Sequence, residues 1–84
     1  MDANTILKAV NDIFIDVLDE NDILLKRETT AKDVEDWDSL NHIQLIISIE
    51  KHFKVRFTTQ EIRGWENVGA MCDSIEIVVN KKLD

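Results

Sequence analysis

The apolar residues of this chain recur at intervals of three and four, and this spacing constrains the fold more than any other feature. The clearest case runs from about Ala3 to Leu18, where one face of a helix would carry Ile6, Val10, Ile13, Phe14 and Val17. The 84 residues contain no proline and only two glycines. Proline would interrupt helices, and strand-rich sandwiches need frequent turns that are rich in glycine and proline. Because both residues are scarce here, we expect helices joined by short connections. The sequence therefore predicts an all-α fold.

A long stretch without a sustained period follows the first helix. Over residues 19–38 we expect Leu25 and Val34 to hold a loop against the core. A loop of this length is uncommon in a compact domain, and usually has a function or packs through its own side chains. A second helix is expected over Ser39–His52, with Asp38 as its N-cap.

Two more helices are expected after a connector in which Val55 and Phe57 turn inward. Thr58 and Glu61 have the spacing of a capping box, which predicts a short third helix ending near Gly64. Asn67 is expected to cap the last helix. Its core stripe would be Val68, Met71, Cys72, Ile75, Val78 and Val79.

Size and charge limit the classes of function. We expect one domain over residues 1–84 that acts as a monomer. A formal net charge of −7 disfavours nucleic acids and anionic membranes as partners and suits docking onto basic patches of enzymes. The single cysteine, Cys72, allows no internal disulfide and is expected in the core. Without an apolar stretch of about 18 residues or a signal peptide, a cytoplasmic location is expected.

The second helix carries more apolar residues than one core face needs. At 100° per residue, one arc holds Leu45, Ile46, Ile49 and Phe53, with His42 among them. A separate arc holds Leu40, Ile43 and Ile47. In so small a protein we expect the first arc to face the core and the second to remain for a ligand or partner.

Ser39 is the candidate for chemistry. It lies at the start of that helix, where free backbone N–H groups and the positive end of the helix dipole favour a covalently attached phosphate. No Gly-x-Ser-x-Gly elbow surrounds it and no base is implied by spacing, which argues against a serine hydrolase. His42 and His52 are too far apart to share a metal, and residues 19–22 lack the glycine and spaced acids of a calcium loop.

With Asp38-Ser39-Leu40 in register with these four helical segments, the chain resembles the acyl carrier protein family from Ile6 to about Val79. The resemblance implies a four-helix bundle of acyl-carrier type, with a long first loop and a short third helix. It also implies that the protein is not an enzyme. Ser39 would accept 4′-phosphopantetheine from a separate phosphopantetheinyl transferase. The arm would carry acyl or aminoacyl groups as thioesters to the enzymes that load and unload it.

The resemblance gives roles to residues around Ser39. The exposed arc, Leu40, Ile43 and Ile47, would flank the arm and form the patch that partner enzymes read, and Ile62 would line its far side. Asp36 and Asp38 would meet basic residues of the transferase.

The sequence departs from housekeeping fatty-acid carriers at Asn41 and Gln44, where those carriers have acids. A dedicated pathway, such as polyketide, modified-sugar or aminoacyl chemistry, thereby becomes more plausible beside fatty-acid biosynthesis. Two alternatives stay open: a peptidyl or aminoacyl carrier of the same fold, and an unmodified helical interaction module.

Overall fold

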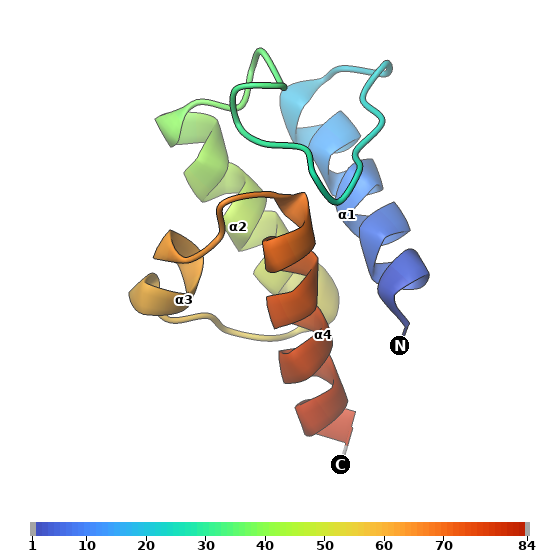
Figure 1. The fold of residues 1–84 in the computed structure, drawn as a ribbon, viewed down its shortest axis with the longest axis vertical. Helices are drawn as coiled ribbons and strands as arrows, with labels where there is room; N and C mark the ends of the chain where they lie inside the picture. Colours follow the sequence, from blue (N-terminus) through green and yellow to red (C-terminus); the bar gives the residue numbers. More distant parts are fainter. Residues whose placement is uncertain (1, 84) are drawn as a thin grey trace.

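The computed structural model describes residues 2–83, with the side chains of residues 2–81. This part of the chain is all-α and contains no strand. Its four helices are α1 (Ala3–Leu18), α2 (Ser39–Phe53), α3 (Thr59–Arg63) and α4 (Val68–Leu83) (Figure 1). The expected helical fold, with its long first loop and short third helix, is confirmed.

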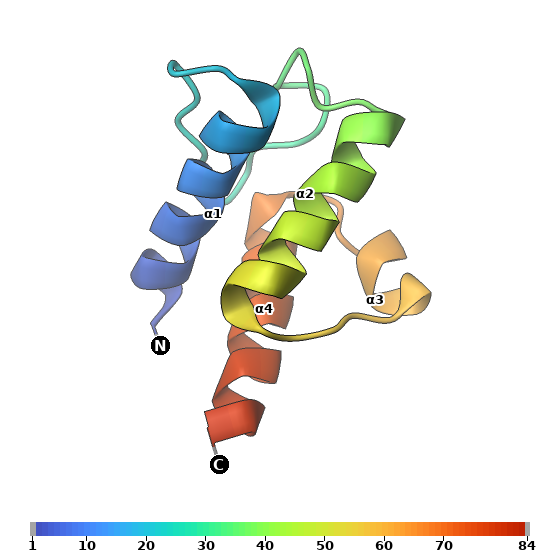
Figure 2. The same ribbon diagram turned by 180° about the vertical axis from the view of Figure 1, so that it is seen from behind.

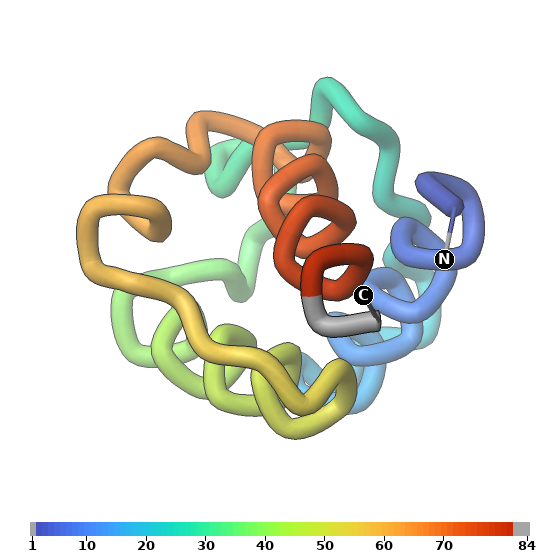
Figure 3. The backbone as a smooth tube through the Cα atoms, turned by 90° about the horizontal axis from the view of Figure 1, so that it is seen from below, coloured from blue at the N-terminus to red at the C-terminus, as the bar shows by residue number. Residues whose placement is uncertain are grey.

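Three long helices surround one core, and the short α3 stands on the side away from α1. Figure 2 shows α2 in front of α4, with α1 and α3 on opposite sides, and Figure 3 shows the same arrangement from below. The largest fully buried side chains are Ile6, Val10, Phe14, Leu45, Ile49, Val68, Met71, Cys72 and Ile75. Because α3 has five residues and buries none of them fully, it covers its side of α2 only in part.

Helix α1 begins and ends at the expected residues. The Asp2 side chain caps it by accepting a hydrogen bond from the Thr5 N–H at 2.8 Å. Asp19 ends it in the left-handed conformation, with φ of 53°. Of the expected stripe, Val17 is only half-buried, and Leu18 is buried as well.

Hydrogen bonds hold the loop over residues 19–38 to two helices, α1 and α4. From α1, the Asn11 side chain accepts a hydrogen bond from Leu25 N–H at 2.6 Å. At α4, the carbonyls of Arg27 and Thr29 accept bonds from the first N–H groups of the helix, at 2.7 and 2.8 Å. These carbonyls satisfy donors that every helix start leaves without a partner. Leu25 is buried and Val34 half-buried, as expected.

Helix α2 runs one residue beyond the expected end at His52. It ends at Phe53, whose ring is buried, and Lys54 then takes the left-handed conformation with φ of 57°. Glycine usually occupies that position, so the sequence carries no signal for the true end.

The connector and the last two helices agree with the prediction, except that Val78 of the expected core stripe is only half-buried. Val55 is buried, Phe57 is half-buried, and the capping box of Thr58 and Glu61 is complete. The Asn67 side chain accepts a bond from the Ala70 N–H at 2.8 Å at the start of α4. The helices found over the described residues include none long and apolar enough to cross a membrane.

Candidate functional site

Ser39 is the first residue of α2 and is exposed. Asp38 caps the helix: its side chain accepts a bond from the Asn41 N–H and its carbonyl one from the His42 N–H, both at 2.8 Å. The N–H groups of Ser39 and Leu40 have no acceptor within the described chain. The hydroxyl therefore lies beside two free donors, at the positive end of a 15-residue helix.

Two side-chain bonds fix the turn that carries Ser39. The Asn41 side-chain amide donates to the Asp36 carbonyl at 2.8 Å, and the Trp37 indole N–H donates to His42 Nδ1 at 2.9 Å. The Trp37 ring also packs edge-on against Phe14 of α1, with ring centroids 4.8 Å apart. Neither bond could be predicted from the sequence. The two hydrogen bonds tie the loop to α2 beside the serine, and the ring contact ties the loop to the core.

An apolar groove between α2 and α3 opens next to Ser39. Its volume is about 770 Å³, within the range of small-molecule sites. Four predicted site residues line it: Asp38 and Ser39 at the start of α2, Ile43 farther along α2, and Ile62 from α3. Ile46 and Trp65 complete its apolar walls. Ile46 was expected in the core. It is only half-buried and lines this groove, because the short α3 leaves the edge of the core arc uncovered.

The second arc of α2 is exposed, as expected: Leu40 is 69%, Ile43 56% and Ile47 42% accessible. The three residues do not line one feature, however. Ile43 belongs to the groove beside Ser39, whereas Ile47 borders a separate hollow at the other end of the helix, with Lys51, Val55 and Arg56. Leu40 lines neither hollow. The arc therefore forms a strip along α2 with a cavity at each end.

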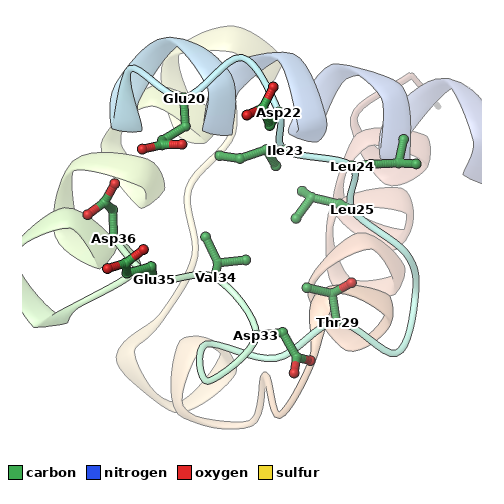
Figure 4. A pocket seen from close by; sticks show the side chains of 10 residues that line it. All are labelled: Glu20, Asp22, Ile23, Leu24, Leu25, Thr29, Asp33, Val34, Glu35 and Asp36. Carbon is green, nitrogen blue, oxygen red and sulfur yellow. The ribbon is translucent and has the colours of Figure 1, made fainter.

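Asp36 lies away from the groove, in an acidic pocket under the long loop (Figure 4). Glu20, in the loop just after α1, points toward Asp36 across one side of this pocket (Figure 4). A hydrogen bond with Asp36 and the charge of that carboxylate raise the pKa of Glu20. Among the described residues, no group of three or more histidine, cysteine or acidic side chains is arranged to hold a metal ion.

Among the described residues, no side chain is hydrogen-bonded to the Ser39 hydroxyl. His42 lines the same groove, but its Nδ1 already accepts the Trp37 N–H, and partial burial lowers its pKa. Cys72 is buried in the core, and burial raises the pKa of its thiol to about 11.

Comparison with solved structures finds a close match. The solution structure of the holo acyl carrier protein of Geobacter metallireducens superposes with a TM-score of 0.87. The two sequences are 42% identical over 92% of this chain and 88% of that one. This chain belongs to the acyl carrier protein family. An acyl carrier protein is a carrier and not an enzyme. No family model matches the chain.

Proposed function

We propose that Ser39 carries 4′-phosphopantetheine and that this acyl carrier protein presents acyl groups, bound to the arm as thioesters, to partner enzymes. The observation that carries the proposal is the position of Ser39: an exposed hydroxyl at the first turn of α2, beside free N–H groups. The matching Geobacter protein is a holo acyl carrier protein, which supports the same chemistry here.

The surroundings of Ser39 fit a phosphate. The backbone N–H groups of Ser39 and Leu40 are free to donate to phosphate oxygens, and the helix dipole favours the negative charge. In the transfer, the Ser39 oxygen would bond to the phosphorus of coenzyme A that bears the pantetheine arm. The bond from that phosphorus to the bridging oxygen would break, so that 3′-phosphoadenosine 5′-phosphate leaves. A base on the transferase would take the hydroxyl proton. The attached arm supplies the thiol that holds the acyl group.

The neighbouring residues have separate roles in this proposal. Ile43 and Ile62 would contact the arm or its cargo in the groove, together with Ile46. Leu40 and Ile47, which lie outside the groove, would contact partner enzymes. Asp36 and Asp38 would meet basic residues of the phosphopantetheinyl transferase.

The whole chain would act as a single carrier domain. Its cargo would be an acyl group of fatty-acid, polyketide or related biosynthesis. A peptidyl or aminoacyl carrier is the alternative, because the same modified serine would serve a different cargo.

Intact-mass measurement tests the attachment site. Apo protein, coenzyme A and a broad-specificity phosphopantetheinyl transferase should yield one phosphopantetheine per chain. Ser39→Ala should abolish the addition and keep the helical circular dichroism. Ser48→Ala, on the same helix, should be modified like the native protein. Modification of Ser39→Ala would contradict the assignment, because the arm would then be on another residue. No modification of the native chain would contradict the proposal and favour an unmodified helical interaction module.

A further inference from the structure

The exposed strip of α2 continues past its apolar residues into a basic end. Leu40, Ile43, Ile47 and Lys51 follow one another at intervals of three and four, so they fall within an arc of about 80°. Lys51 is exposed, like the three apolar residues. One face of the helix therefore leads from Ser39 to the hollow at the far end.

That hollow combines an apolar floor with a positive rim. Ile47 and the buried Val55 form its apolar part, and Lys51, Lys54 and Arg56 surround it. The one acid among the lining residues, Glu50, accepts a hydrogen bond from the Phe57 N–H at 2.9 Å. Its carboxylate is thus engaged by the connector.

The charge of this segment is opposite to that of the protein. With three basic residues and Glu50, residues 39–57 have a formal net charge of +2 in a chain of −7. The end of the strip near Ser39 adjoins Asp38, which lines the same groove as Ile43. The strip is therefore acidic at one end and basic at the other. Lys51 follows Ser39 by twelve residues, so at about 1.5 Å of helix rise per residue the basic end lies about 18 Å from Ser39.

We infer that this strip docks onto partner enzymes through an acidic surface that meets Lys51, Lys54 and Arg56. That surface would lie about 18 Å from the opening that receives the arm on Ser39. The inference rests on the proposed function, since Ser39 defines the working end of the strip. Complementary charges at two ends fix the orientation of docking and exclude partners with uniformly basic surfaces. Leucine or a similar side chain of the partner would fill the hollow beside Ile47.

A stapled amphipathic helix of leucine and glutamate imitates the acidic partner surface and is used as the binding probe. A helix of leucine and lysine is the probe of opposite charge. Binding to the full apo chain is followed by amide chemical shifts at about 0.1 M salt, where charges beyond about 10 Å are screened. The acidic helix should shift amides of residues 47–56. Lys51→Glu with Arg56→Glu should weaken this binding about fivefold or more.

Lys8→Glu with Lys26→Glu is the matched control, because it changes the net charge equally at exposed positions outside both hollows of α2. It should alter the affinity by less than about twofold. Equal loss in both double variants, or no shift in residues 47–56, overturns the inference. So does binding to phosphatidylglycerol vesicles without binding to the acidic helix, since the strip would then be a membrane contact. Ser39→Ala should bind the acidic helix like the native chain, so failure of this test and failure of the phosphopantetheine assay are distinguishable.

Discussion

Replacing Ile47 and Ile49 by alanine, one at a time, separates the face of α2 that stabilises the fold from the face available to partners. The two residues have the same side chain on the same helix. Ile49 is completely buried, whereas Ile47 is 42% exposed. The comparison therefore changes the environment and keeps the chemistry of the substitution constant.

The expected costs follow from burial. Cutting a buried isoleucine to alanine costs about 2–5 kcal/mol, a large fraction of the stability of so small a domain. At about 4–8 °C per kcal/mol, Ile49→Ala should lower the melting temperature by roughly 8–40 °C. Ile47→Ala should cost about 1 kcal/mol or less, because much of its surface is already in water and alanine is the better helix former.

Thermal unfolding followed by circular dichroism measures the first effect, and acyl loading by a partner enzyme measures the second. Ile47→Ala should slow loading with a melting temperature within about 8 °C of the native value. Ile49→Ala should load normally at temperatures where it is still folded. Equal destabilisation by the two changes would refute the division of α2 into two faces.

Three further predictions concern the loop and the Ser39 turn. Glu20→Gln should raise the melting temperature at neutral pH, because Asp36 raises the pKa of Glu20, and the gain should vanish below about pH 4.5, where Glu20 is protonated folded or unfolded. The free energy of unfolding, measured with denaturant, should fall as the pH drops below about 6.5, because burial lowers the pKa of His42 and its protonation then opposes folding. In His42→Asn this fall should be smaller. Gly69→Ala should cost roughly 1–3 kcal/mol in urea unfolding, since its Cβ would lie 2.9 Å from the Arg27 carbonyl oxygen. Gly64→Ala, with no neighbour closer than 3.4 Å, should cost much less; equal costs would contradict the clash.

The helices could be predicted because their signals are local. The stripe of α1, the capping box at Thr58 and the cap at Asn67 each depend on residues within one or two turns, and all three are present. The predicted end of α2 was wrong by one residue, because Lys54 adopts the left-handed conformation that glycine usually takes after a helix.

The surroundings of Ser39 were harder to predict, because they depend on contacts between distant segments. A helical wheel separates the two arcs of α2 but does not show where α3 lies. It therefore placed Ile46 in the core and grouped Ile43 with Ile47, which line different hollows. The bond from Trp37 to His42 likewise requires the path of the loop, which no periodicity records.

The loop attachments illustrate the same limit. Asn11 looks like an ordinary polar residue of α1, yet it holds the loop through Leu25. Gly69 looks like a weak point in α4, yet the close approach of the Arg27 backbone requires its missing side chain.

The central claim is that Ser39 carries an acyl group on a phosphopantetheine arm. The most direct test is the mass of the protein expressed together with its neighbouring genes, before and after treatment with hydroxylamine, which cleaves thioesters. The mass should exceed that of the bare chain by the arm and an acyl group. Hydroxylamine should remove only the acyl part, and peptide mapping should place the remaining arm on Ser39. A bare chain under these conditions, or an arm on any other serine, would contradict the claim.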